Sequence, residues 1–106
     1  MQLAKVIFDL TKLLPKKEMY GMTAQLRKCA VSIPSNIAEG SQRTTDADFG
    51  HFIAIARGSL AEAQTQMLLA RDFDYISQQD AEHIEQRISE LGKMLHAFHA
   101  KLNASR

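Results

Sequence analysis

Cysteine, proline and glycine are scarce in this chain of 106 residues, which has one cysteine, two prolines and five glycines. Tryptophan is absent. The single Cys29 excludes an intrachain disulfide, and its place on an apolar helical face predicts core packing rather than a reactive thiol. No apolar run reaches the ~20 residues of a membrane span, and no signal peptide is recognisable. The sequence therefore predicts a soluble, cytoplasmic protein with one domain over residues 1–106.

Motifs that carry catalytic chemistry are also missing. The chain has no Gly-rich phosphate loop, and no serine lies in a recognisable Ser-His-Asp pattern. His96 and His99 share one helix edge, but the Glu-x-x-His motif of di-iron bundles is absent, so neither a metal nor a cofactor is predicted. Glu39 and Glu62 are carboxylates without a catalytic partner, and their expected role is structural. These observations argue against an enzyme.

Apolar residues recur at helical spacing in four segments, which predicts helices over residues 2–14, 19–39, 45–74 and 78–102. The last segment has the strictest pattern, with steps of 4, 3, 4, 3 and 4. This seam consists of Ile84, Ile88, Leu91, Leu95, Phe98 and Leu102. Such a seam is typical of helices that supercoil in a bundle. We expect an all-α, antiparallel, up-down-up-down four-helix bundle.

The sequence also predicts where helices begin and end, and it places a proline inside the second helix. Thr45 and Ser77 are the expected N-caps of the third and fourth helices. Pro34 lies inside the second helical pattern and predicts a kink, because proline removes one backbone hydrogen bond. We expect Asn36 to satisfy the carbonyl freed by that kink. Gly40 is predicted to end the helix in a left-handed conformation.

The third helix carries more apolar and small residues than one core-facing stripe needs. A four-helix monomer buries about one face of each helix, so the additional face predicts a contact in a homo-oligomer. The alternative is that these residues are merely small and exposed. The candidate interface residues are Val31, Ala54, Ile55, Gly58, Ala61 and Leu69.

Charge is unevenly distributed along the chain. Residues 1–45 carry seven Lys/Arg and three acids, residues 46–90 carry three and nine, and residues 91–106 carry three Lys/Arg without acids. This pattern suggests a basic surface for nucleic-acid phosphates, although neighbouring helices of opposite charge also neutralise one another, and a cation cluster is often only a solvated face. The candidate binding residues are Lys16, Lys17, Arg27, Lys28, Arg43 and Arg57. Without stacking aromatics, binding is expected to be salt-sensitive and weakly sequence-specific.

The run from Leu26 to Gly40, with its Ser-Ile-Pro-Ser-Asn-Ile-Ala-Glu-Gly string, closely resembles a family signature. The family is the four helix bundle proteins, or 23S rRNA intervening sequence proteins, some of which are encoded in insertions within bacterial 23S rRNA genes. The resemblance continues through Phe49, Phe52, Gly58–Glu62 and Gln66–Ala70. It covers nearly the whole chain and implies the four-helix fold.

The same family is similar to the accessory variability protein of diversity-generating retroelements. That protein is a pentameric bundle with a basic channel that binds nucleic acid and a reverse transcriptase. The resemblance therefore implies a pentameric ring, and it makes Arg27, Lys28 and Arg43 the matching basic positions. A reverse transcriptase partner is implied by the resemblance alone.

The leading hypothesis is a non-enzymatic oligomer that binds RNA, DNA or a ribonucleoprotein through a basic surface. The alternative is a protein-interaction scaffold without nucleic-acid binding. The two hypotheses differ over Arg27, Lys28 and Arg43. Binding predicts that these residues gather on one accessible surface, whereas the scaffold predicts that they pair with acids such as Asp72, Asp74 or Glu82.

Overall fold

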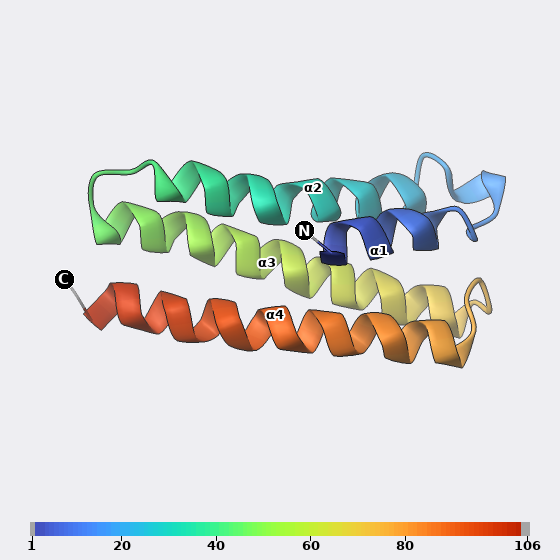
Figure 1. Cartoon of the computed structure of the whole chain (residues 1–106). Coiled ribbons are helices and arrows are strands. Elements are labelled where there is room, and N and C mark those ends of the chain that lie inside the picture. Colours follow the sequence, from blue (N-terminus) through green and yellow to red (C-terminus); the bar gives the residue numbers. More distant parts are fainter. Residues whose placement is uncertain (1, 105–106) are drawn as a thin grey trace.

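A computed structural model describes residues 2–104, which form four α-helices and one short 3₁₀ helix. The elements are α1 (Gln2–Thr11), η1 (Lys16–Glu18), α2 (Met22–Ser41), α3 (Asp46–Asp72) and α4 (Gln78–Ala104). Each α-helix runs in the opposite direction to the one before it (Figure 1). No strand occurs among the described residues. The predicted all-α, four-helix fold is confirmed.

Short-range hydrogen bonds set most of the helix boundaries. Thr45 Oγ1 accepts from the Asp48 backbone N at 3.1 Å, and Ser77 Oγ accepts from the Asp80 backbone N at 3.0 Å, so both N-caps lie where the sequence placed them. Helix α1 ends at Thr11, three residues earlier than expected. The chain there tightens into i to i−3 bonds, the last from Leu14 N to the Thr11 carbonyl at 3.2 Å.

Helix α2 is continuous through Pro34 and ends at Ser41, so Gly40 is not a left-handed cap; no described glycine has a positive φ. Gly40 is required for another reason. A Cβ atom there would lie 2.8 Å from Phe49 Cδ1 and 2.8 Å from Phe52 Cβ, so the glycine lets α2 and α3 approach closely.

The Asn36 side chain also differs from its expected role. Its Nδ2 donates to the Ser32 carbonyl at 2.8 Å and to Ser32 Oγ at 3.0 Å. The carbonyl that Pro34 leaves without its usual partner is that of Ala30, one turn before Pro34. The side chain therefore reinforces the helix backbone beside Pro34 instead of satisfying the freed group. The kink itself stays a prediction.

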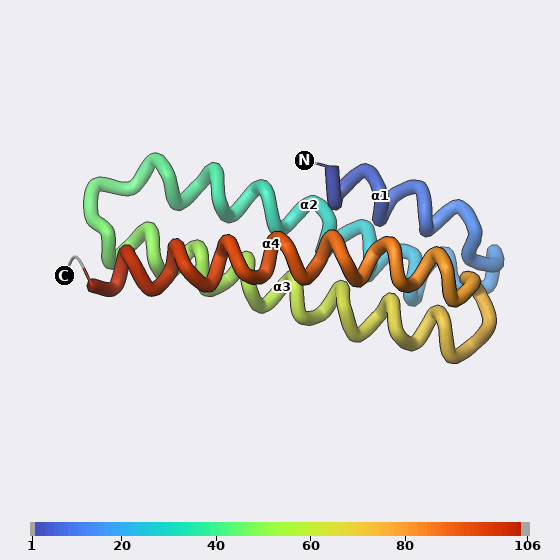
Figure 2. The backbone as a smooth tube through the Cα atoms, turned by 60° about the horizontal axis from the view of Figure 1, so that its bottom comes forward, coloured from blue at the N-terminus to red at the C-terminus, as the bar shows by residue number. Residues whose placement is uncertain are grey.

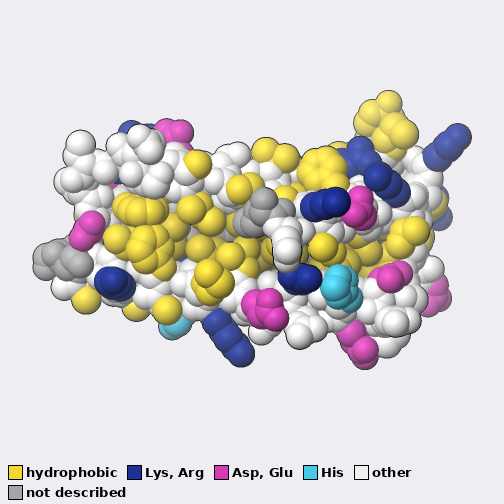
Figure 3. Space-filling view, viewed as in Figure 1, with side chains coloured by type: hydrophobic (Ala, Val, Ile, Leu, Met, Phe, Trp, Pro, Cys, Tyr) yellow, Lys and Arg dark blue, Asp and Glu magenta, His cyan; other side chains and the backbone are white. Residues whose placement is uncertain are grey.

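The first helix is much shorter than the other three and covers only part of the bundle. Figures 1 and 2 show that α1 begins partway along α2 and α4, so the far half consists of α2, α3 and α4. Hydrophobic side chains are visible at the surface of that half (Figure 3). Ile37, Phe49 and Phe98 are partly buried against the core there, and the rings of Phe49 and Phe98 pack edge to face with centroids 5.0 Å apart.

Candidate nucleic-acid interface

The segment from α1 to the start of α2 is rich in positive charge. Residues 2–28 include six Lys/Arg and only two acids, Asp9 and Glu18. They form α1, η1 and the first turns of α2, and Figure 3 shows several Lys and Arg side chains here, with Asp and Glu side chains among and below them. The α3–α4 connection lies at the same end of the bundle and carries the acids Asp72, Asp74, Asp80 and Glu82. We call this region the basic end. The structure therefore brings Lys16, Lys17, Arg27 and Lys28 to one end of the molecule.

Arg27 joins α2 to α1. Its Nε donates to Thr11 Oγ1 at 3.0 Å, and its guanidinium lies 5.5 Å from the Phe8 ring centroid. Thr11 in turn donates to the Phe8 carbonyl at 2.6 Å. The hydrogen bond from Nε to Thr11 and the contact with the Phe8 ring hold the guanidinium in place, so its Nη groups lie at the surface. Lys28 is exposed and points about 100° away around the helix.

The η1 segment is anchored by contacts with the α3–α4 loop. Tyr75 Oη donates to Glu18 Oε2 at 2.9 Å, and Lys17 Nζ lies 5.8 Å from the Tyr75 ring centroid. Both contacts join residues that are nearly sixty positions apart in the chain. Lys16 is exposed beside them. The tertiary fold thus positions these two lysines, which a free loop would leave unrestrained.

The two remaining candidate cations lie elsewhere. Arg43 follows α2 at the opposite end, where it pairs with Glu39 Oε1 at 2.6 Å and covers the Phe52 ring at 4.6 Å. Arg57 lies between α3 and α4, close to two histidines. Neither Arg27 nor Arg43 is placed in an ion pair with Asp72, Asp74 or Glu82. Only part of the predicted set therefore shares a surface.

The candidate oligomer residues all lie at the surface of the single chain. Val31 is 53 % exposed, and Ile55 and Leu69 are each 39 % exposed. Ala54, Gly58 and Ala61 are also exposed, and a Cβ atom built at Gly58 would meet nothing within 4 Å. The packing of one chain therefore does not explain a glycine in the middle of α3.

A polar seam between α2 and α3 was not recognised in the sequence. Ser32 Oγ and Ser59 Oγ are 2.8 Å apart, and Cys29 Sγ donates to Glu62 Oε2 at 3.6 Å. Burial raises the pKa of the Cys29 thiol from 9.0 to about 11, and the charge and hydrogen bond of Glu62 add to this rise. A thiol with this pKa is protonated at neutral pH and has little nucleophilic character. Only the pairing of the two helices reveals this seam.

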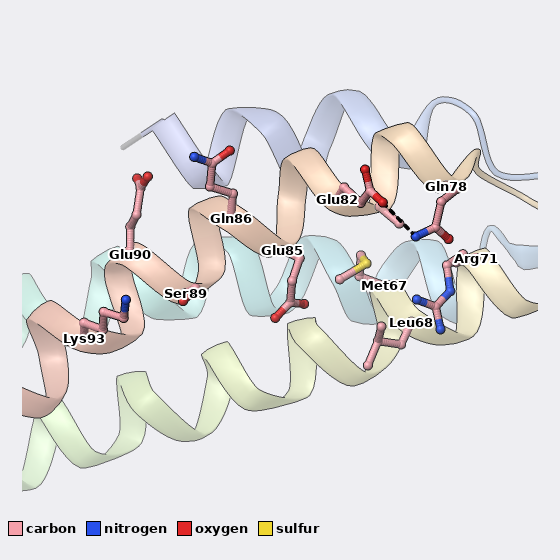
Figure 4. A pocket seen from close by; sticks show the side chains of 11 residues that line it. Met67, Leu68, Arg71, Gln78, Glu82, Glu85, Gln86, Ser89, Glu90 and Lys93 are labelled. Carbon is pink, nitrogen blue, oxygen red and sulfur yellow. Dashed lines mark hydrogen bonds between the residues drawn. The ribbon is translucent and has the colours of Figure 1, made fainter.

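An open cleft of about 630 Å³ lies between α3 and α4 (Figure 4). Its charged residues are Glu82, Glu85, Glu90, Arg71 and Lys93, and Glu85 Oε1 accepts from Gln64 Nε2 at 2.7 Å. The excess of carboxylates disfavours a phosphate ligand. Within residues 2–104, no cluster of His, Cys, Asp and Glu is arranged to hold a metal ion. Over the same residues, no helix has the length and apolar composition of a membrane span.

Comparisons with known proteins agree with this fold. A crystal structure of a protein of unknown function from Bacteroides thetaiotaomicron, described as a member of the S23 ribosomal protein family, superposes with a TM-score of 0.85. The two sequences are 27 % identical, and the match covers 92 % of each chain. A comparison with curated protein sequences gave no match. The family model for the 23S rRNA-intervening sequence protein matches residues 1–97. This chain therefore belongs to the 23S rRNA-intervening sequence protein family.

Proposed function

We propose that this protein is a non-enzymatic, homo-oligomeric module that binds RNA or a ribonucleoprotein through its basic end. The family takes its description from sequences that interrupt 23S rRNA, and neither the family model nor the similar structure of unknown function indicates a catalytic family. The proposed contacts are made with the phosphate backbone. A pentameric ring, as the resemblance to the retroelement accessory protein implies, would present this end several times and strengthen binding to a long polyanion.

The observation that carries the proposal is the restrained basic end. Six cations and two acids lie within residues 2–28, and the Arg27 guanidinium is fixed by Thr11 and Phe8 instead of by a carboxylate. A guanidinium that is not neutralised by an acid retains its full attraction for phosphate oxygens. Because the Arg27 side chain has already lost part of its conformational freedom in the folded protein, binding a ligand costs it less conformational entropy.

The second candidate is a protein-interaction scaffold. The exposed apolar side chains of Val31, Ile55 and Leu69 favour it, because such side chains gain free energy when another protein covers them. An oligomer interface and an RNA surface are compatible within one molecule. The two functions therefore differ in one measurable property, which is whether the assembled protein binds nucleic acid.

The test measures molar mass by light scattering during size-exclusion chromatography, alone and with structured RNA at low and high salt. We expect an oligomer that binds RNA at low salt and releases it at high salt. The Arg27→Glu/Lys28→Glu variant should lose binding, and a variant that neutralises Arg27 and Lys28 should reduce the slope of log K against log salt by about 2. The matched control is Lys93→Glu/Lys101→Glu, which changes the net charge equally on α4 and should still bind.

Three results separate the candidates. An oligomer that is indifferent to RNA and DNA at low salt favours the scaffold and rejects the binding module. If Arg27→Glu/Lys28→Glu and Lys93→Glu/Lys101→Glu lose RNA binding equally, the loss follows from net charge. That result rejects the basic end as the specific binding surface. A monomer at all concentrations rejects the oligomer in both candidates. Circular dichroism of each variant shows whether the helices remain folded.

A further inference from the structure

Arg57 on α3 meets two histidines of α4. Its Nη2 lies 3.1 Å from His96 Nδ1, and its Nη1 lies 3.4 Å from His99 Nδ1. A guanidinium only donates hydrogen bonds, so each of these contacts is a hydrogen bond only when Nδ1 accepts, which requires a neutral ring with its proton on Nε2. Asn103 Nδ2 lies 3.4 Å from His99 Nδ1 as well. Arg57 thus faces two imidazoles and no carboxylate.

No acid lies within one helical turn of this cluster on either helix. Three and four residues from Arg57, α3 carries only Ile53, Ala54, Leu60 and Ala61. One turn from the two histidines, α4 carries Gly92, Lys93, Leu95, Ala100, Leu102 and Asn103. Lys93, one turn from His96, lines the acidic cleft together with Glu90. The immediate surroundings do not neutralise the guanidinium.

The nearest carboxylates on the two helices are directed elsewhere. Glu62 on α3 accepts a hydrogen bond from Cys29 of α2, and Glu90 on α4 lines the acidic cleft six residues before His96. Asp46 and Asp48 lie at the start of α3, nine or more residues from Arg57, which corresponds to about 13 Å along the axis. The remaining imidazole on α3, His51, packs against Phe52.

Protonation changes what this cluster can bind. Histidine is the side chain whose charge ordinarily changes between about pH 5 and 8. A protonated imidazole has an N–H on both nitrogens, so it no longer accepts from Arg57. Three cationic groups then repel one another at hydrogen-bond distance. An oxyanion relieves the repulsion, because its oxygens accept from all three groups.

We infer that Arg57, His96 and His99 form a proton-gated site for a phosphate group at the seam between α3 and α4. This inference deepens the proposed function by assigning it a second phosphate contact, away from the basic end, that strengthens as pH falls. The phosphate comes from a nucleic-acid backbone or from free phosphate. By linkage, a bound phosphate stabilises the protonated histidines as much as protonation strengthens phosphate binding.

The experiment follows the imidazole resonances of the full chain by NMR between about pH 5 and 8. Samples contain inorganic phosphate or chloride at equal ionic strength. With phosphate at ten times its Kd for the doubly protonated site, the two titration midpoints should rise by about one pH unit in total. This corresponds to roughly half a unit each for His96 and His99. His51 and His83 are internal controls. Shifts of His96 and His99 no larger than those of the controls overturn the inference.

Variants identify the ligand and separate this site from the basic end. Arg57→Gln should abolish the phosphate-dependent shift of both histidines, whereas His51→Gln should leave it unchanged; retention in Arg57→Gln overturns the inference. A short single-stranded oligonucleotide, added at pH 6 and pH 8, replaces phosphate in the second arm. A shift with the oligonucleotide supports a backbone contact, and a shift with inorganic phosphate alone supports a free-phosphate site. The Arg27→Glu/Lys28→Glu variant should retain the phosphate-dependent rise in the midpoints of His96 and His99. This measurement tests the Arg57 site independently of RNA binding at the basic end.

Discussion

Replacing each of two helical glycines by alanine tests the packing described above. Gly40 and Gly58 both lie inside helices and neither has a positive φ, so alanine fits the backbone at both sites. Alanine is more favourable than glycine in a helix interior by about 1 kcal/mol. At Gly58 the new methyl group meets open space, so Gly58→Ala should stabilise the single chain by about this amount.

At Gly40 the same methyl group meets two phenylalanines. The Cβ would lie 2.8 Å from Phe49 Cδ1 and from Phe52 Cβ. The Phe49 ring can rotate, but the Phe52 Cβ is fixed to the backbone of α3, so α2 and α3 must separate. Overpacking of this kind costs about 1–3 kcal/mol. We therefore expect Gly40→Ala to be less stable than Gly58→Ala by about that amount.

Thermal unfolding followed by circular dichroism measures the difference. For a domain of this size about 1 kcal/mol shifts Tm by about 4–8 °C, so the Tm of Gly40→Ala should lie on the order of 10 °C below that of Gly58→Ala. Equal Tm values, or a more stable Gly40→Ala, would refute the reasoning about helix approach. If another backbone covers Gly58 in an oligomer, Gly58→Ala should also weaken assembly, which light scattering across a dilution series detects.

Two further predictions concern the polar seam between α2 and α3 and the N-cap of α3. Because the pKa of Cys29 is raised from 9.0 to about 11, its contribution to stability is complete below pH 9 and is lost as pH rises through about 11. Chemical denaturation across this range should show a decline that Cys29→Ala lacks, and an identical decline in both proteins would contradict it. Thr45→Ala removes the acceptor for the Asp48 N–H and should cost about 1 kcal/mol, measured by urea unfolding; Thr44→Ala, the control, should cost much less.

Local patterns predicted the helices well, because spacing and capping act within a few residues. Thr45 and Ser77 cap the helices that follow them, as the sequence indicated. Gly40 was interpreted wrongly for an instructive reason. A glycine near a helix end is typical of a left-handed cap, and its actual partners, Phe49 and Phe52, belong to the next helix.

The candidate site was only partly predictable. Charge along the chain indicated a basic region, but it did not show that Arg27 would lie on Phe8 or that Arg43 would pair with Glu39. The sequence did not assign the histidines to a metal site, and it gave no sign of their contact with Arg57. Arg57 and His99 are 42 positions apart, and no sequence motif connects them.

The sequence by itself determined the helical class, the number of helices and the family signature. These depend on the period of apolar residues, on capping side chains and on a contiguous string around Pro34. The tertiary structure alone decided which side chains meet between helices, including Ser32 with Ser59 and Arg57 with His96. The physical reason is register: apolar stripes favour packing at many axial offsets, and the actual offset follows from close contacts such as Gly40 against Phe52.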